Sequence, residues 1–460
     1  MKTHNTKRST DPTDDFWLVR FMRFTASIVP EAISTAALML VVVVTLALLV
    51  GNTLLVTMDA WYRGLWMLLP FTMQMTLILV LGSVLASTPL FKRIITSISR
   101  IPRTPVEVIA LSVLLVAFLS YLNWGLALTL GPLIAVHFAH EAEIKGIPID
   151  FPFLLAVNTA AISVWQFGLS ATGPLMMATS GHFLENVTGV MPLHSTIWSP
   201  AAIFLVLIFP PVLILTALLL MPRKPQQLSM FPEALELVQK HPLVKEQDHE
   251  ESNFSTKVEH SRIVTIILCI ALFGWLYYHF LIKGSSLDLN SLNTIFLLFC
   301  FLLCGNIRKF SKAVEAAVVS SWTIIVLYHL YAGIAGLIQF TTIGQIIASL
   351  FTPFSTKWTF TFLTIVAGTI VAIFVPSSGG QWVIQGFVTT TVAKVIGLTP
   401  QRGMLALGVG DQMGNLISPF WYVIIAKIAR IDFRTFYGYG LIFALVWLLL
   451  GIIVFTFLPC

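Results

Sequence analysis

Four short segments rich in Gly, Pro, Ser and amide side chains interrupt stretches of sequence that are otherwise apolar. Residues 121–125 and 168–174 lie in the first half of the chain, and residues 375–382 and 410–415, followed by Pro419, lie in the second. Pro removes a backbone donor and Gly tolerates non-helical dihedral angles, so each segment is expected to break a helix. A broken helix offers N–H groups to an anion and carbonyls to a cation. These segments therefore predict a site for a carboxylate and a cation that needs no arginine.

Side chains in or beside these four segments are the candidates for contact with a substrate or an ion. Lipid tolerates a broken helix only where the break is buried in protein or lines a watery cavity. The alternative is that the segments are ordinary kinks with Ser and Asn used for packing, which membrane helices often contain. We predict binding roles for Asn123, Trp124, Gly125, Ser170, Thr172, Gly173, Pro376, Ser377, Ser378, Gly379, Gly380, Gln381, Gln385, Asp411, Gln412 and Asn415.

Asp411 is the one carboxylate deep within an apolar region of the sequence. An ionised group inside a membrane is costly, so such residues are usually functional. We expect Asp411 to accept a proton or to bind a cation. The alternative is a carboxylate that caps the N-terminus of a half-helix. His329 lies in another apolar stretch, where a lone histidine is more often a hydrogen-bonded packing residue than a titrating one.

An enzymatic alternative comes from residues 408–411, which match the Gly-x-Gly-Asp string of intramembrane aspartyl proteases. That chemistry needs two carboxylates that share a proton. The apolar regions of the sequence contain no second Asp to pair with Asp411, and neither a serine nucleophile elbow nor a zinc motif is present. Cys300 and Cys304 lie one helical turn apart without a neighbouring His or carboxylate, which favours packing over a metal site. The prediction is a protein that is not an enzyme.

The composition identifies the solvent that surrounds these segments. Hydrophobic residues make up 57% of the 460 residues and charged residues 10%, against about a quarter charged in a soluble domain. Helices that are apolar all round fit lipid rather than water. The net charge of +6 comes from basic residues in a few short segments, as in the cytoplasmic loops of bacterial inner-membrane proteins, and needs no nucleic-acid partner. We predict an all-α polytopic membrane protein.

Hydrophobic runs and interruptions divide the chain into four parts. Residues 1–30 are predicted as a cytoplasmic N-terminus with an interfacial helix, 31–221 as a first membrane repeat, 222–262 as a cytoplasmic linker and 263–460 as a second repeat. The broken regions within the two repeats are 106–180 and 358–430. The continuous spans, each near the 20 residues that a bilayer needs, are expected at 32–56, 65–86, 197–221, 263–282, 291–305, 313–337 and 438–458.

The placement of Lys and Arg predicts the orientation of the two broken regions. The N-terminus and the loops at 87–105, 222–262, 306–312 and 427–434 are basic and are expected in the cytoplasm, whereas 181–196 contains no Lys or Arg. Within its own repeat, the first broken region follows two continuous spans and the second follows three, so the two regions enter the membrane from opposite sides. Similarly interrupted segments of opposite orientation are typical of inverted-repeat transporters.

These interrupted segments also resemble the short-chain fatty acid transporter family, which includes bacterial carriers associated with acetoacetate and butyrate uptake. The resemblance runs over nearly the whole chain, and its most specific string is residues 375–386. Further matching strings are 123–125, 168–170, 174–175, 181–185, 410–412 and 415–421.

The resemblance implies an inner-membrane carrier of small monocarboxylates, related to a superfamily with inverted repeats and re-entrant hairpins. In that superfamily a transport domain is thought to move against a scaffold, in an elevator-like manner, with coupling to Na⁺ or H⁺. By analogy, the broken regions form the transport domain and the continuous helices form the scaffold. The sequence departs from the family pattern near the breaks, so the exact substrate does not follow: the departures are Gln166, Phe167, 171–173, Ser378, Phe387, Met413 and Gly414.

We therefore predict a secondary active transporter of short-chain fatty acids, coupled to H⁺ or Na⁺, in the bacterial inner membrane with its N-terminus in the cytoplasm. An anion channel remains the alternative. The expected partners are a small carboxylate and the lipid bilayer, and a homodimer is left open. No cofactor or resident metal is expected apart from the coupling ion.

Overall fold

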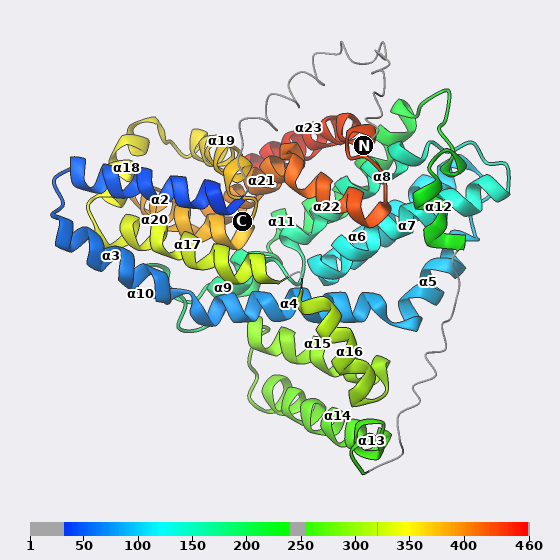
Figure 1. Ribbon diagram of the computed structural model, residues 1–460. Helices are drawn as coiled ribbons and strands as arrows, with labels where there is room; N and C mark the ends of the chain where they lie inside the picture. Colours follow the sequence, from blue (N-terminus) through cyan, green and yellow to red (C-terminus); the bar gives the residue numbers. More distant parts are fainter. Residues whose placement is uncertain (1–31, 240–253, 320, 459–460) are drawn as a thin grey trace, which may run out of the picture.

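The computed structural model describes residues 32–239, 254–319 and 321–458 (Figure 1). Within these residues the chain forms helices and turns and no strand. In this described part of the chain, six helices are long and apolar enough to cross a membrane, or seven if the bent pair of α17 (Trp322–Phe340) and α18 (Ile343–Phe351) counts as one span. The prediction of an all-α polytopic membrane protein is confirmed, while the interfacial helix predicted within 1–30 lies outside the described residues.

The first hydrophobic segment folds as two helices. The single span predicted over 32–56 is wrong, because α2 (Ala32–Leu49) ends before Gly51, whose φ of 92° reverses the chain. Thr53 then caps α3 (Leu54–Met67), which continues into α4 (Leu69–Ser87) as one long apolar stretch. The helix α3 packs closely on α17, since a Cβ on Gly64 would lie 2.8 Å from the Cα of Gly336.

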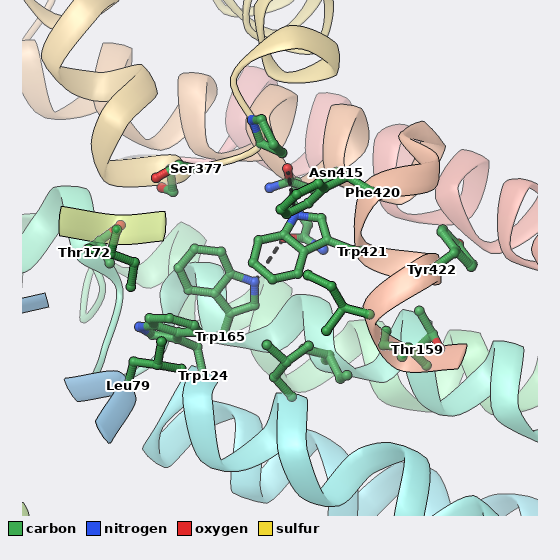
Figure 2. A pocket seen from close by; sticks show the side chains of 18 of the residues that line it. Leu79, Trp124, Thr159, Trp165, Thr172, Ser377, Asn415, Phe420, Trp421 and Tyr422 are labelled. Atoms are coloured by element: carbon green, nitrogen blue, oxygen red, sulfur yellow. Dashed lines mark hydrogen bonds between the residues drawn. The ribbon is translucent and has the colours of Figure 1, made fainter. Parts of the chain in front are cut away.

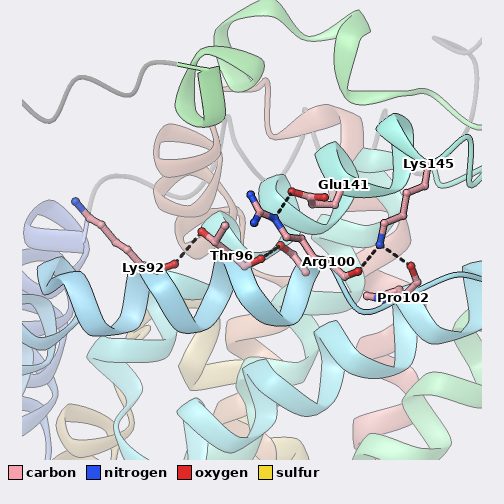
Figure 3. A network of polar contacts seen from close by, with 7 residues as sticks. Lys92, Thr96, Arg100, Pro102, Glu141 and Lys145 are labelled. Carbon is pink, nitrogen blue, oxygen red and sulfur yellow. Dashed lines mark hydrogen bonds and ion pairs between the residues drawn. The ribbon is translucent and has the colours of Figure 1, made fainter.

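Helix α5 (Pro89–Ser99) carries the basic loop that follows α4, and it is fastened to the end of α7 (Trp124–Ile144). The Lys145 ammonium donates to the carbonyl oxygens of Arg100 and, at 2.9 Å, Pro102, which stand free at the end of α5 (Figure 3). Arg100 also pairs with Glu141 at 3.3 Å. Because the Arg100 side chain is mostly exposed, we attribute the attachment chiefly to Lys145.

The first broken region contains a helical hairpin followed by a broken helix. Helices α6 (Pro105–Leu122) and α7 pack against each other on either side of Asn123, whose backbone is extended. Helix α8 (Phe151–Ala161) continues as the 3₁₀ helix η2 (Ile162–Phe167), stops, and resumes as α9 (Thr172–Ala178). The two breaks touch, because the Leu169 N–H donates to the Tyr121 carbonyl at 2.7 Å.

The second broken region has the same order of elements. Helix α19 (Thr359–Phe374) and α20 (Ser378–Val395) flank a break at Val375–Ser377, and α21 (Pro400–Ile417) and α22 (Pro419–Ala429) flank Ser418. The prediction that 410–415 breaks a helix is wrong, since these residues are helical and the chain bends only at Ser418 and Pro419. Asp411 lies in the interior of α21 and so does not cap a helix N-terminus.

The glycines of 410–415 serve helix packing. A Cβ on Gly410 would overlap the Ile365 carbonyl oxygen, and one on Gly414 would overlap the Cβ of Ala372. Both contacts are with α19, so Gly410 and Gly414 form a small-residue seam along which two backbones approach closely. This close approach holds Asp411, one residue after Gly410, at a fixed depth in the protein.

Substituting Gly410 by Val is expected to lower the free energy of unfolding by about 1–3 kcal/mol, because the added methyl groups force α19 and α21 apart. Thermal unfolding of the detergent-solubilised protein measures the effect. The matched control is Gly438→Val on α23 (Arg434–Phe457), where nothing lies within 4 Å of an added Cβ. Equal melting temperatures of the two variants would refute the packing role of Gly410.

The remaining helices surround the two broken regions. The predicted span 313–337 is wrong, because α16 ends at Val318 and α17 begins at Trp322. Helix α14 (Arg262–Tyr277) is buried along only 11% of its apolar length, so most of its apolar surface is exposed. The other elements are α10 (Glu185–Thr188), η3 (Leu193–Ser195), α11 (Pro200–Leu220), η4 (Leu228–Met230), α12 (Pro232–Gln239), α13 (Phe254–Glu259), α14 (Arg262–Tyr277), η5 (Tyr278–Ile282), α15 (Leu289–Cys304), α16 (Ile307–Val318) and η6 (Thr352–Phe354).

The described part of the predicted linker docks onto the first broken region. Asp150 accepts the Gln226 N–H at 2.9 Å and the Phe153 N–H at 2.8 Å, so it joins the linker to the start of α8. Burial raises the pKa of the Asp150 carboxyl, and the two backbone hydrogen bonds oppose that rise. Glu143 accepts a further bond from the Ser229 N–H at 3.1 Å.

Candidate functional site

A cavity of about 270 Å³ lies where the four interruptions of the helices meet. Each interruption contributes to its wall: Trp124 follows the first, Thr172 the second, Ser377 belongs to the third and Phe420 follows the fourth (Figure 2). Apolar and aromatic side chains form most of the remaining wall. They include Leu79, Ile162, Trp165, Leu327, Leu416 and Trp421.

The residues predicted from the sequence divide into three groups around this cavity. Seven line it: Trp124, Thr172, Pro376, Ser377, Ser378, Gln412 and Asn415. Gly173 and Asp411 instead border a second, much smaller void of about 10 Å³, which also touches Ser378. The others lie outside both linings: Asn123, Gly125, Ser170, Gly379, Gly380, Gln381 and Gln385. Their contribution to binding stays a prediction, and the structure shows what they contact.

Asn123 and Ser170 hold the first break in shape. The Asn123 amide oxygen accepts the Leu126 N–H at 2.9 Å and thereby caps α7, while its amide nitrogen donates to the Ile78 carbonyl of α4 at 3.4 Å. Ser170 Oγ accepts the Trp124 N–H at 2.9 Å. Both polar side chains therefore orient Trp124, which itself reaches the cavity.

Gln381 has a similar supporting role in the second half. Its amide nitrogen donates to the Gly368 carbonyl at 2.6 Å and to Gln385 Oε1 at 2.7 Å, so α20 is tied to α19 behind the hairpin tip. At the tip itself, Ser377 Oγ donates to the Tyr328 hydroxyl at 3.0 Å and accepts the Gly380 N–H at 3.4 Å. Ser377 is thus the N-cap of α20, and the positive end of that helix dipole lies at the cavity wall.

Gln412 joins the two broken regions. Its amide oxygen accepts the Trp165 indole N–H at 2.9 Å, and its amide nitrogen donates to Ser163 Oγ at 2.9 Å. Sequence reasoning did not select Ser163 or Trp165 as site residues. Their position just before the break at 168–174 is the signal that would have found them.

Asp411 is buried at 1% exposure and only partly satisfied. Its Oδ2 accepts the Asn415 amide N–H at 3.1 Å, and Asn415 Oδ1 accepts the Trp421 indole N–H at 3.2 Å. The second carboxylate oxygen, Oδ1, has no hydrogen-bond partner among the described residues. A carboxyl held in this way, beside a void with room for about one water molecule, is suited to hold a proton.

The protease-like string at 408–411 is explained by packing. A Cβ on Gly408 would lie 3.0 Å from the Gln166 amide nitrogen, and Gly410 lies against Ile365. Within the part of the chain that the structure describes, no carboxylate hydrogen-bonds to Asp411. His329 likewise packs, since its Nδ1 lies 2.7 Å from the Ile325 carbonyl oxygen and its ring meets Trp66 edge-on.

Four residues of the cavity wall carry buried hydrogen-bond donors that have no partner in the described structure. They are the indole N–H of Trp124 and the hydroxyls of Thr172, Tyr331 and Tyr422. A buried polar group without a partner costs about 1–3 kcal/mol, so such groups usually signal a missing ligand or water. Donors beside apolar walls suit a ligand with acceptor oxygens at one end and hydrocarbon at the other.

Comparisons with known proteins give the family of this chain. The family model described as "Short chain fatty acid transporter" matches residues 17–458. The "Putative short-chain fatty acid transporter" of Escherichia coli (strain K12) is 29% identical over 441 residues, covering 95% of this chain and 99% of that protein. A protein of the same name from Haemophilus influenzae is 29% identical over 429 residues, with 91% and 94% covered.

A solved structure supports the fold. The YdaH transporter of Alcanivorax borkumensis, described as having an unusual topology, superposes with a TM-score of 0.57 at 15% sequence identity, covering 93% of this chain and 98% of that one. This likeness concerns the fold alone. The family match spans nearly the whole chain, including all four interruptions and the cavity between them. The chain is therefore a multi-pass membrane protein that belongs to the short-chain fatty acid transporter family.

Proposed function

We propose that this chain is a secondary active transporter that carries short-chain monocarboxylates across the bacterial inner membrane together with a proton. The observation that carries the proposal is the cavity at the four interruptions, where buried donors without partners stand beside apolar walls. The family, and the names of the relatives from E. coli and H. influenzae, support a short-chain fatty acid as the substrate.

The carboxylate is assigned to the end of the cavity formed by Thr172 and Ser378. Thr172 offers a hydroxyl without a partner, and Ser378 begins α20, whose N-terminal dipole favours an anion. These two elements touch, since a Cβ on Gly379 would lie 3.4 Å from the Cβ of Thr172. An anion at this point binds to hydroxyls and a helix dipole, without an arginine.

The hydrocarbon part of the substrate is assigned to the remaining wall. Leu79, Ile162 and Leu416 present aliphatic surface, and Trp165 is held in a fixed orientation by its bond to Gln412. Burying a methylene group contributes about 0.8 kcal/mol, so affinity rises with chain length until the cavity is filled. The carboxylate and the alkyl chain of a short acid therefore both contribute to the free energy of binding.

Asp411 is the proposed carrier of the coupled proton. It lies one helical turn from Asn415, which lines the cavity, and it borders the small void that Ser378 shares. A membrane-embedded carboxylate of this kind is neutral when it carries a proton and charged when it does not, so its two states differ strongly in cost within lipid. The basic loop at 87–105 supports a cytoplasmic location for the end of the protein that carries α5.

Counterflow exchange in proteoliposomes tests the substrate class. Vesicles preloaded with unlabelled butyrate are expected to take up labelled butyrate faster than protein-free vesicles, and external acetate and acetoacetate should compete. Butyramide has the same shape without the negative charge and serves as the matched control, with no competition expected. Exchange at the protein-free rate, or competition by butyramide as strong as that by butyrate, would refute the carboxylate assignment. Net downhill flux without exchange would favour a channel instead.

A further inference from the structure

Two tryptophans of the cavity wall are anchored to neighbouring positions of one helix. The Trp165 indole N–H donates to Gln412 Oε1 at 2.9 Å, and the Trp421 indole N–H donates to Asn415 Oδ1 at 3.2 Å. Gln412 and Asn415 lie three residues apart on α21, so their side chains are neighbours on the helix surface. The two amides therefore hold the two indole rings near each other, each in a fixed orientation.

These rings come from opposite halves of the chain and stand in the middle of the cavity. Trp165 belongs to η2, before the break that precedes Thr172, and Trp421 belongs to α22. Figure 2 shows Thr172 on one side of the view, Thr159 on the other, and the two tryptophans between them. The ring of Trp124, also in the wall, lies 6.3 Å from that of Trp165. Aromatic surface therefore lines the middle of the cavity.

The end of the cavity assigned to the carboxylate lies beside this aromatic surface. Gln166, the residue after Trp165, donates from its amide nitrogen to Ser378 Oγ at 2.9 Å. Ser378 is one of the two residues to which we assign the carboxylate, and both it and Trp165 line the cavity. The backbone that carries Trp165 thus runs next to the carboxylate end. A short spacer is enough to join a carboxylate at Ser378 to a group that contacts the rings.

The cavity is larger than butyrate needs. An apolar cavity of about 150 Å³ holds benzene, which corresponds to roughly 25 Å³ for each non-hydrogen atom. At that ratio, the cavity of about 270 Å³ holds about ten such atoms. Butyrate, with six non-hydrogen atoms, fills roughly half of it, whereas phenylacetate, with ten, fills nearly all of it. Size and wall chemistry therefore both favour an acid that carries an aromatic ring.

We propose that this site binds and transports arylacetates, of which phenylacetate is the simplest, and binds them more tightly than butyrate. The carboxylate binds at Thr172 and Ser378, and the aryl ring packs against Trp165 and Trp421. Aromatic rings that meet edge-to-face or offset attract each other beyond the effect of the area they bury. The inference rests on the proposed function, since it keeps the carboxylate site and extends the substrate class.

Competition for counterflow exchange in proteoliposomes tests the substrate class. Vesicles preloaded with butyrate take up labelled butyrate, and the rate is taken above that of protein-free vesicles. The concentration of phenylacetate that halves this rate is expected to be roughly tenfold below that of unlabelled butyrate, because the ring buries more apolar surface. It should also be roughly threefold or more below that of cyclohexylacetate, which has a similar size without aromaticity. Preloaded phenylacetate should drive uptake of labelled butyrate, as preloaded butyrate does, which distinguishes transport from blockage.

Variants locate the ring. Trp421→Leu should raise the half-inhibitory concentration of phenylacetate severalfold and remove its advantage over cyclohexylacetate, because the aromatic contact is lost while an apolar side chain remains. Trp165→Leu should act in the same direction, and it decides if Trp421→Leu does not fold. The matched control is Trp275→Leu on α14, where the ring is exposed and does not line the cavity. That variant should keep the wild-type values for all three acids.

Three results would overturn the assignment to arylacetates. They are phenylacetate that competes no better than butyrate, cyclohexylacetate that competes as well as phenylacetate, and competition by phenylacetate that fails to drive exchange from inside. A Trp421→Leu variant that behaves like Trp275→Leu, or Trp165→Leu in its place, would also contradict it. Absence of protein-dependent butyrate exchange in the wild type would instead refute the proposed function, so the two failures are distinguishable.

Discussion

Replacing Asp411 by Asn is expected to abolish butyrate uptake driven by a pH gradient, while exchange of butyrate for butyrate continues. Asn has nearly the shape of Asp and cannot release a proton, so the loaded carrier can turn over only by exchanging one substrate for another. The carboxyl is buried and hydrogen-bonded to Asn415, and an amide fits the same space. Initial rates in proteoliposomes, taken above the protein-free rate, measure both reactions.

The control for this prediction is Asp59→Asn on α3, where the carboxylate is exposed and paired with Arg63 at 3.8 Å. Its removal should leave driven uptake at the wild-type rate, because an exposed pair contributes little. Driven uptake retained in full by Asp411→Asn at normal protein levels would rule out Asp411 as the proton carrier. If a folded Asp411→Asn variant loses exchange as well as uptake, Asp411 is needed for substrate binding instead.

Thr172→Val is expected to raise the half-saturation concentration for butyrate about tenfold or more, since a hydrogen bond to a charged group contributes about 1.5–3 kcal/mol. The substitution keeps the shape of the side chain and removes a hydroxyl that has no partner in the described structure. Exchange kinetics over a range of butyrate concentrations give the value. The maximal rate should change much less than the half-saturation concentration.

The chain supplies a closely matched control in Thr159. Both threonines line the cavity and are almost equally buried, at 4% exposure for Thr172 and 5% for Thr159. The Thr159 hydroxyl already donates to the Leu155 carbonyl at 2.8 Å within its own helix. Thr159→Val should therefore leave the half-saturation concentration nearly unchanged. If the two substitutions raise the half-saturation concentration equally, the shape or polarity of the wall sets the affinity, and the free hydroxyl of Thr172 does not.

The positions of the helix breaks were largely predictable, because the backbone chemistry of Gly and Pro is local. Breaks at Asn123, before Thr172 and at Pro376 all fall within the segments chosen from the sequence. The fourth was misplaced, since Gly410 and Gly414 were interpreted as breakers and in fact face α19. A glycine that flexes the chain and one that admits a neighbouring helix look alike in sequence, and only tertiary packing separates them.

The roles of individual polar side chains were less predictable than the breaks. Asn123 and Gln381 are in the right segments, yet their amides are hydrogen-bonded to backbone groups behind the cavity. Gln166 was noticed only as a departure from the family pattern, although it contacts both Ser378 and the Asp411 carboxyl. Which way a side chain points depends on contacts between segments more than two hundred residues apart, and a single sequence does not contain them.

Initial rates of labelled butyrate uptake into proteoliposomes, under an imposed pH gradient or an imposed sodium gradient, test proton-coupled carboxylate transport most directly. Because protonated butyric acid also crosses lipid unaided, the rate is taken above that of protein-free vesicles. An inward proton gradient without sodium is expected to drive uptake that a protonophore abolishes, and a sodium gradient at equal pH should drive none. Uptake driven by sodium alone, or no protein-dependent uptake under either gradient, would contradict proton-coupled transport through this site.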